Sequence, residues 1–349
     1  MSKPLRIGNL EAKIPVIQGG MGVGISLSGL AGSVASCGGI GVISTAQIGW
    51  REPDFRKNPF EANFRAIEKE IKKAREIAKG GIIGVNIMVA TQRYEEYVKT
   101  AVKAGVDLII SGAGLPVDLP KYVAGTKTKI APIVSSLKSL NVICRMWERK
   151  YKTAPDLVVI EGPKAGGHLG FSREELDTFT EEDYDEVIRS IIEKVKEYGE
   201  KFAKKIPVVV AGGIYDRKDM EHAMDLGADG VQMGTRFVTT KECDASEAYK
   251  QTYIQAKKED IRIVQSPVGM PGRAIANPFL ERVKKEKSKI SHCYKCIVTC
   301  DQKEIPYCIT EALVNAAEGR VNDGLLFCGA NAYRSEKIET VEEIMKEFA

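Results

Sequence analysis

Long apolar runs are missing from this sequence: no stretch of its 349 residues approaches the roughly 18 uninterrupted apolar residues of a membrane span. The N-terminal segment MSKPLRIGNLEAKIPVIQGG also lacks the apolar core of a secretory signal peptide. We therefore expect a cytoplasmic protein with no membrane partner. In that compartment its eight cysteines are expected to be reduced or metal-bound rather than paired in disulfides.

An excess of charge of one sign is also missing. The 51 basic and 47 acidic residues leave a net charge of only +4, and no basic stretch is interleaved with aromatic side chains. Nucleic acid is therefore not expected as a partner. A hydrophobic content of 44% is typical of a globular protein with a large core. The composition leaves the oligomeric state open, a homo-oligomer included.

What the sequence does contain is a repeated alternation of short apolar runs and longer segments with helical periodicity. Such alternation is typical of a parallel sheet that is buried on both faces. The predicted strands are Pro15–Gly20, Ile40–Ser44, Ile82–Met88, Leu108–Gly114, Ile130–Ser135, Leu157–Gly162, Pro207–Gly213 and Gly230–Phe237. Helices are predicted at Leu27–Cys37, Glu61–Lys79, Arg93–Ala104, Glu181–Lys204 and Arg217–Leu226. This pattern predicts an α/β fold, the (β/α)8 TIM barrel, with an open doubly wound sheet plus an extra domain as the alternative.

The turns that lead from a helix into the next strand resemble one another. Ala104–Asp107 has the sequence AGVD, Thr153–Asp156 has TAPD, and Leu226–Asp229 has LGAD. Glycine suits a left-handed helix end, and aspartate suits a tight turn. Repetition of one unit favours the closed barrel.

Beyond Phe237 the alternation ends. Further helices are predicted at Ala245–Lys258, Pro278–Ser288, Thr310–Glu318 and Val341–Phe348, with a Pro/Gly-rich loop at Ser266–Asn277. We divide the chain into a barrel domain, residues 1–240, and a C-terminal helical extension, residues 241–349. The extension is expected to cap the mouth of the barrel, where substrates enter.

Two glycine-rich turns follow the last two predicted strands, where barrels of this kind commonly bind phosphate. They are Ala211–Ile214 (AGGI) and Gln232–Phe237 (QMGTRF). The glycines Gly212, Gly213 and Gly234 let backbone N–H groups approach phosphate oxygens, and Thr235 and Arg236 could add a hydroxyl and a positive charge. Tight turns alone would explain the glycines, but their presence in both expected loops predicts a phosphate site.

Glycine-rich turns also follow earlier strands, at Gly19–Gly24 and Gly112–Gly114. Neither matches G-x-G-x-x-G, so a Rossmann-type dinucleotide site is not expected. They predict instead a close approach of the backbone to a flat ring system. Polar residues at the strand ends indicate a ligand with several hydrogen bonds: Asn86, Ser111, Glu161 and Gln232.

The chain has only three histidines, and one of them lies in a glycine-framed loop after the sixth predicted strand. His168 in this loop, Glu161–Gly170 (EGPKAGGHLG), is predicted to be catalytic, because an imidazole can act as a base or a hydrogen-bond donor near neutral pH. His222 is expected on a helix surface. His292 adjoins a cysteine cluster.

Taken in order along the chain, these motifs resemble one family. They are Pro15–Gly22 (PVIQGGMG), Gly84–Met88 (GVNIM), Gly112–Gly114, the Glu161–Gly170 loop, Ala211–Ile214 and Gly234–Phe237. The chain resembles the nitronate monooxygenase (2-nitropropane dioxygenase) family over about residues 5–280. That family is similar to the flavin-dependent enoyl-acyl-carrier-protein reductases and to NADH:quinone reductases of the same barrel.

The resemblance implies FMN as the cofactor, a small-molecule substrate, and His168 as the active-site histidine. It implies these cofactor-binding residues: Gly20, Met21, Asn86, Gly166, Gly167, Ala211, Gly212, Gly213, Gln232, Gly234 and Thr235. Met270–Asn277 resembles the stretch that folds over the substrate pocket. The Gly22–Ile25 turn departs from the commonest forms of the first loop, which leaves the substrate open.

Four cysteines of the extension are closely spaced, as Cys293-x2-Cys296-x3-Cys300-x7-Cys308. Thiolates at such spacing can hold zinc or an iron–sulfur cluster. The spacing is similar to that of the [4Fe-4S] site of dienoyl-CoA reductase-like flavoproteins, although the last gap is shorter here. A [4Fe-4S] cluster, a structural zinc ion and unliganded thiols all stay open.

The resemblance implies an oxidoreductase that oxidises alkyl nitronates with oxygen at the flavin. The first alternative is a reductase of an enoyl thioester or a quinone that takes NAD(P)H as co-substrate. The nicotinamide would then share the substrate pocket, because no separate dinucleotide fold is predicted. The second alternative is a barrel that binds a phosphorylated ligand without redox chemistry.

Overall fold

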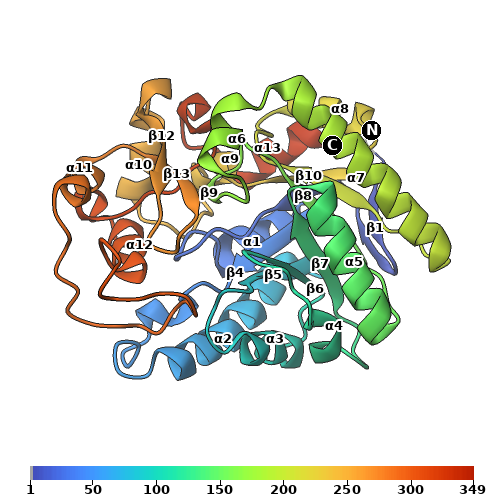
Figure 1. The fold of residues 1–349 in the computed structure, drawn as a ribbon, viewed down its shortest axis with the longest axis horizontal. Helices are drawn as coiled ribbons and strands as arrows, with labels where there is room; N and C mark the ends of the chain where they lie inside the picture. Colours follow the sequence, from blue (N-terminus) through green and yellow to red (C-terminus); the bar gives the residue numbers. More distant parts are fainter. Residues whose placement is uncertain (1–2) are drawn as a thin grey trace.

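Eight parallel strands close into a barrel in the order of the sequence (Figure 1). The computed structural model describes residues 3–349. The barrel strands are β3 (Val16–Gln18), β4 (Ile40–Ser44), β5 (Ile82–Met88), β6 (Leu108–Gly112), β7 (Lys129–Val134), β8 (Val158–Glu161), β10 (Val208–Ala211) and β11 (Gly230–Met233). Because β11 pairs with β3, the sheet has no free edge. The predicted TIM barrel is confirmed, and the open-sheet alternative is wrong.

The barrel strands are apolar on both faces, as a barrel surrounded by helices requires. All five residues of β4 and all five of β6 are buried. Alternate residues belong to two apolar clusters: Ile17 and Val42 pack inside the barrel, whereas Val16 and Ile43 pack against the helices. An N-terminal hairpin, β1 (Leu5–Ile7) and β2 (Leu10–Ala12), adds apolar side chains to the interior cluster.

The three similar turns perform one task in the structure. Asp107 accepts a hydrogen bond from the backbone N–H of Ile83 at 2.9 Å. Asp156 and Asp229 accept equivalent bonds, each at 3.0 Å, from residues at or near the start of β7 and β10. Each aspartate precedes one strand and ties down the preceding strand of the barrel. The repeated aspartate therefore fixes the position of each of these strands relative to its neighbour.

The helices cover the outside of the barrel and continue into the extension (Figure 1). They are α1 (Ser28–Ser36), α2 (Pro59–Ala78), α3 (Tyr94–Lys103), α4 (Leu119–Tyr122), α5 (Leu137–Tyr151), α6 (Arg173–Thr178), α7 (Glu181–Lys201), α8 (Arg217–Asp225), α9 (Thr235–Val238), α10 (Glu247–Gln255), α11 (Pro278–Lys285), α12 (Ile309–Ala317) and α13 (Val341–Phe348), with 3-10 turns η1 (Ile48–Arg51), η2 (Lys258–Asp260), η3 (Val321–Asp323) and η4 (Ala332–Arg334). All nine predicted helices are present. The helices α4, α5, α6 and α9 were not predicted. The last barrel strand ends at Met233, earlier than predicted, because α9 begins at Thr235.

Five residues of the predicted loop Ser266–Asn277 form a strand. β13 (Pro271–Ile275) pairs with β12 (Ile261–Gln265) and, on its other side, with the short strand β9 (Gly167–His168). The Pro and Gly residues that indicate a loop lie at one end of this hairpin. Pairing with β9 attaches the extension to the loop that carries His168.

The last helix of the extension belongs to the outer layer of the barrel. α13 contacts α1 and α8, and its residues Val341, Ile344, Met345 and Phe348 are buried in the same apolar cluster as the barrel helices. The division of the chain near residue 240 stays a prediction. Within residues 3–349, no helix has the length and apolar character to cross a membrane.

Candidate active site

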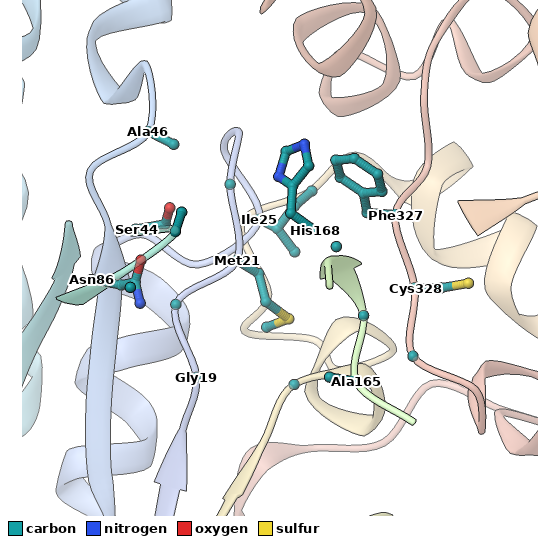
Figure 2. Close-up of a pocket in the computed structure, with 18 of the residues that line it drawn as sticks. Gly19, Met21, Ile25, Ser44, Ala46, Asn86, Ala165, His168, Phe327 and Cys328 are labelled. Atoms are coloured by element: carbon teal, nitrogen blue, oxygen red, sulfur yellow. The ribbon is translucent and has the colours of Figure 1, made fainter. Parts of the chain in front are cut away.

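A cavity of about 280 Å³ lies at the carboxyl ends of the barrel strands. Figure 2 shows Ser44 and Asn86 on one side of it and His168, Phe327 and Cys328 on the other. The residues predicted for the FMN site line this single cavity: Gly20, Met21, Asn86, Gly166, Gly167, Ala211, Gly212, Gly213, Gln232, Gly234 and Thr235. His168 lines it too. Residues far apart in the sequence therefore meet around one volume.

The two glycine-rich turns follow neighbouring strands, β10 and β11. Gly212 has φ +93° and Gly213 has φ +91°, which is backbone that favours glycine. A Cβ atom on Gly212 would lie 2.9 Å from the carbonyl oxygen of Gly162. The first turn therefore needs glycine both for its conformation and for its contact with the His168 loop.

The turn after β3 meets the end of β5 at very close range. A Cβ atom on Gly20 would lie only 2.4 Å from Cβ of Asn86. On the other side of this turn, the side chain of Gln232 packs near Gly19, and its Oε1 atom is buried without a hydrogen-bond partner within residues 3–349. A buried acceptor without a partner is unfavourable by about 1–3 kcal/mol. The cavity thus offers an unused acceptor beside a flat glycine surface.

His168 lies on β9, opposite Gly272 of β13. Its Nε2 atom is 2.7 Å from Oγ of Ser266, and its ring meets the ring of Phe327 edge to face at a centroid distance of 4.9 Å. Burial lowers the pKa of His168 to about 4, because the charged imidazolium loses its hydration. The imidazole is neutral at pH 7, with its orientation held by a hydroxyl group.

Glu161 ends β8 and lines the same cavity. Its main-chain oxygen accepts a hydrogen bond from the Tyr184 hydroxyl at 2.9 Å, and burial raises the pKa of its carboxyl group to about 7. Lys164 is the one Lys or Arg among the described lining residues, and its Nζ pairs with Glu181 at 3.0 Å. The cavity therefore holds a carboxyl group that no cation compensates.

Arg236 does not line the cavity, contrary to the prediction that it adds positive charge to the phosphate site. Its guanidinium group pairs with Glu339 at 3.1 Å and with Glu347 at 2.8 Å, and it donates to the carbonyl oxygen of Tyr215 at 3.1 Å. A side chain pointing away from the barrel mouth cannot reach a ligand there. Of the two side chains that were expected to add a hydroxyl and a positive charge, only that of Thr235 belongs to a lining residue.

Two other predicted groups have structural partners. The hydroxyl of Ser111 donates to the carbonyl oxygen of Ile87 at 2.7 Å and lies 2.8 Å from the Tyr94 hydroxyl, so this residue stabilises the barrel wall. His222 pairs with Asp185 at 3.0 Å on the surface, as expected for a helix residue.

The structure does not support the predicted metal site at Cys293, Cys296, Cys300 and Cys308. In the part of the chain that it describes, no three His, Cys, Asp or Glu side chains are arranged to hold a metal ion. Cys296 lines the cavity, whereas the other three thiols do not. Sequence spacing alone indicated a cluster. Burial and, to a smaller degree, charge on a neighbouring thiol of the cluster raise the pKa of Cys296, Cys300 and Cys308, so the four thiols lie near one another, but within residues 3–349 they are not arranged to hold a metal ion.

Several lining residues were not predicted. Ser44 ends β4 and Ala46 and Gln47 follow it, so their position at a strand end could have indicated them. Further barrel residues that were not predicted are Thr91, Tyr97, Ile133, Met233 and Val238. Others come from the extension, where the sequence carries no such signal: Tyr249, Tyr253, Val268, Ile297, Ile309, Thr310, Leu313, Phe327, Cys328, Gly329, Ala330 and Asn331. They reach the cavity only because the extension folds back over the barrel.

A closed (β/α)8 barrel with two glycine turns after its last strands and a partly buried imidazole above its mouth is the architecture of a flavin-dependent oxidoreductase. The chain belongs to the nitronate monooxygenase family, whose model matches residues 3–349. The resemblance inferred from the motifs is thereby confirmed.

Individual relatives agree with this family. A probable nitronate monooxygenase from Staphylococcus saprophyticus is 25% identical over 304 residues, which are 81% of each chain. One from Staphylococcus haemolyticus is 26% identical over 304 residues, 81% of this chain and 80% of the relative. Among solved structures, FabK from Thermotoga maritima is 25% identical with a TM-score of 0.71, over 97% of this chain and 92% of that one. A nitroalkane oxidase from Streptomyces ansochromogenes, 18% identical over 96% and 94% of the two chains, shares the fold at a TM-score of 0.71.

Proposed function

We propose that this protein is an FMN-dependent oxidoreductase of the nitronate monooxygenase type, which oxidises alkyl nitronates with oxygen. The observation that carries the proposal is the convergence of His168, Gln232 and the two glycine turns on one cavity. When bound, FMN supplies a ring that accepts and releases electrons, and this chain supplies binding, orientation and proton handling.

The residues present fit FMN. The unpartnered Oε1 of Gln232 offers an acceptor for an N–H or O–H group of a ligand, next to the flat surface of Gly19 and Gly20. Gly212, Gly213, Gly234 and Thr235 form the part of the cavity that suits a phosphate group. Asn86, Met21, Gly166, Gly167 and Ala211 complete the proposed binding set.

His168 is the proposed catalytic residue. A neutral imidazole can donate one hydrogen bond to a nitronate oxygen or accept a proton from the α-carbon of a nitroalkane. Its hydrogen bond with Ser266 restricts the ring to one orientation. Phe327 beside it excludes water from one edge of the imidazole.

The second candidate is an NAD(P)H-dependent reductase of an enoyl thioester or a quinone. A nitronate is an anion, yet the cavity contains the carboxyl group of Glu161 and no cation except Lys164, which Glu181 neutralises. Neutral substrates avoid this repulsion. The structural similarity to FabK from Thermotoga maritima favours the same alternative.

Anaerobic rapid mixing separates the two candidates. The FMN-loaded protein is mixed with an alkyl nitronate, NADH or NADPH, and the visible flavin absorbance is followed. Loss of absorbance with the nitronate supports the monooxygenase. Rapid loss with a nicotinamide and none with the nitronate would replace it by the reductase.

A further inference from the structure

A short segment of the extension, Cys328–Asn331, lies against both glycine-rich turns. The backbone N–H of Gly329 donates to Oγ1 of Thr235 at 3.0 Å, and Nδ2 of Asn331 donates to the carbonyl oxygen of Gly213 at 2.7 Å. The backbone N–H of Ala330 donates to the carbonyl oxygen of Lys164 at 3.1 Å. One segment therefore contacts the turn after β10, the turn after β11 and the His168 loop.

The contact with Thr235 determines what its hydroxyl group can do. A hydroxyl has one proton to donate, and here its oxygen already accepts a hydrogen bond from Gly329. The proton of Thr235 is then free to point into the cavity, toward an acceptor such as a phosphate oxygen. A Cβ atom on Gly329 would lie 2.5 Å from this Oγ1 atom, so the segment fits against Thr235 without spare room.

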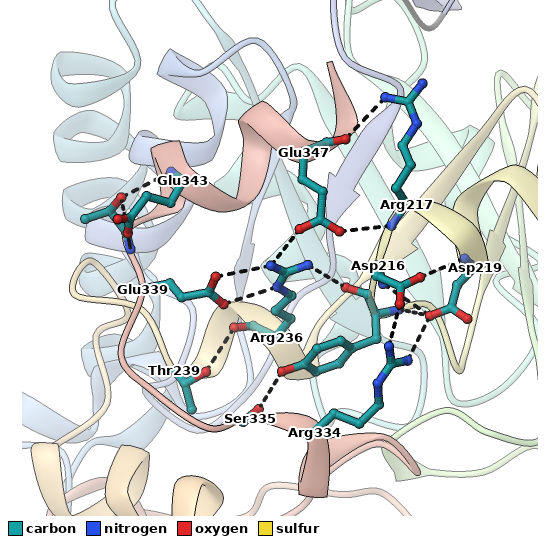
Figure 3. A network of polar contacts seen from close by, with 12 residues as sticks. Asp216, Arg217, Asp219, Arg236, Thr239, Arg334, Ser335, Glu339, Glu343 and Glu347 are labelled. Atoms are coloured by element: carbon teal, nitrogen blue, oxygen red, sulfur yellow. Dashed lines mark hydrogen bonds and ion pairs between the residues drawn. The ribbon is translucent and has the colours of Figure 1, made fainter.

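The chain that follows this segment is held by the ion pairs of two arginines, Arg334 and Arg236 (Figure 3). Arg334 pairs with Asp216 at 2.5 Å and with Asp219 at 3.2 Å, just after the first turn. Within the second turn, Arg236 is paired with Glu339 and Glu347. The residue that was expected to bind phosphate thus anchors the end of the chain instead.

We propose that Gly329 and Asn331 are positioning residues for the phosphate group of FMN, and that the Arg236 and Arg334 ion pairs keep their segment in place. This inference rests on the proposed FMN site. It assigns to the C-terminal segment the ability to distinguish FMN from riboflavin, which has the same ring and ribityl chain but no phosphate.

The test measures dissociation constants of FMN and of riboflavin by quenching of flavin fluorescence, using flavin-free full-length protein. Asn331→Ala is expected to weaken FMN binding roughly five- to tenfold, the effect of one lost hydrogen bond, and to change riboflavin binding less than twofold. Glu339→Gln, which weakens the ion pair with Arg236, should likewise raise the dissociation constant of FMN more than that of riboflavin. Asn322→Ala is the control, because this exposed asparagine of the extension contributes only main-chain contacts.

Each outcome has a distinct meaning. If Asn331→Ala weakens both flavins equally, or neither, the positioning role is wrong while the FMN site stands. A wild-type protein that binds neither flavin would contradict the proposed function and this inference together. Thermal unfolding of the flavin-free variants shows whether a loss of binding reflects a loss of folding. A folded Asn331→Ala protein with the unequal shift supports the proposal.

Discussion

The imidazole of His168 and the hydroxyl of Ser266 lie 2.7 Å apart, although 98 positions separate them in the chain. The barrel contributes the histidine, and the extension contributes the serine. Pairing of β9 with β13 brings them together. The orientation of the proposed catalytic group is therefore set by a residue outside the barrel.

Replacing this serine should impair turnover more than cofactor binding. Ser266→Ala leaves the imidazole free to rotate, so we expect kcat/KM to fall about tenfold, equivalent to about 1.4 kcal/mol. The dissociation constant of FMN should stay within twofold. Ser288→Ala, at an exposed serine of the extension, is the control. Equal activity of the two variants would contradict an orienting role for Ser266.

Acid should destabilise the folded protein through His168. Its pKa is lowered from 6.5 to about 4 by burial, and it returns to its ordinary value in the unfolded chain. Between these values the unfolded chain binds a proton that the folded protein excludes, so the free energy of unfolding falls as pH falls, by up to about 3 kcal/mol. Urea titrations across this range should show a weaker pH dependence in His168→Gln. An unchanged slope would mean that the imidazole is solvated.

Glu161 should make the free energy of unfolding depend on pH in the opposite direction. Burial raises the pKa of its carboxyl group from 4.5 to about 7, so its contribution to stability is lost as pH rises through this interval. Glu161→Gln is expected to raise the free energy of unfolding by about 1–3 kcal/mol near pH 8 and to leave it unchanged near pH 4. Glu76→Gln, at an exposed helix position, is the control for removing a charge. A stabilisation that is equal at both pH values would contradict the assignment.

The ion pairs of Arg236 should matter far more than a surface pair. Its side chain is only 10% exposed, and its removal leaves Glu339 and Glu347 without their cation. We expect Arg236→Ala to lower the free energy of unfolding by about 3–5 kcal/mol. Arg6→Ala, which breaks a pair with Glu11 at an arginine that is 67% exposed, should lower it by less than about 1 kcal/mol. Similar urea midpoints for the two variants would refute this difference.

Two glycines with the same φ angle allow the effect of backbone strain to be distinguished from the effect of steric contact. Gly212 and Gly80 both have φ +93°, so alanine at either position is strained by about 1 kcal/mol. A Cβ atom on Gly80 would have no neighbouring atom within 4 Å, whereas one on Gly212 would lie 2.9 Å from the carbonyl oxygen of Gly162. We expect Gly212→Ala to lose FMN binding and Gly80→Ala to retain it, as measured by flavin fluorescence. Retention in both variants would argue against a tight phosphate turn.

Much of the barrel was predictable, because its strands and turns are encoded locally. Apolar runs such as Ile40–Ser44 are buried on both faces. In each of the three similar turns an aspartate, such as Asp107, accepts a backbone hydrogen bond from the neighbouring strand. The helix α5 was missed although it begins with a capping box at Ser136 and Ser139. The motif glycines and His168 were found for the same local reason: a strand end and a following turn identify the mouth of a barrel.

The sequence by itself determined the eightfold alternation, the two glycine turns and the loop that carries His168, since each depends on residues a few positions apart. Tertiary structure alone decided which groups surround them. Arg236 turned away from the mouth because Glu339 and Glu347, more than a hundred positions later, satisfy its charge in a buried site. Cys328–Asn331 entered the cavity because the extension returns to the barrel. The four clustered cysteines, although near one another, do not form a metal-holding arrangement within residues 3–349. Spacing in the chain restricts distances only over short segments, whereas long-range contacts depend on how the whole extension packs.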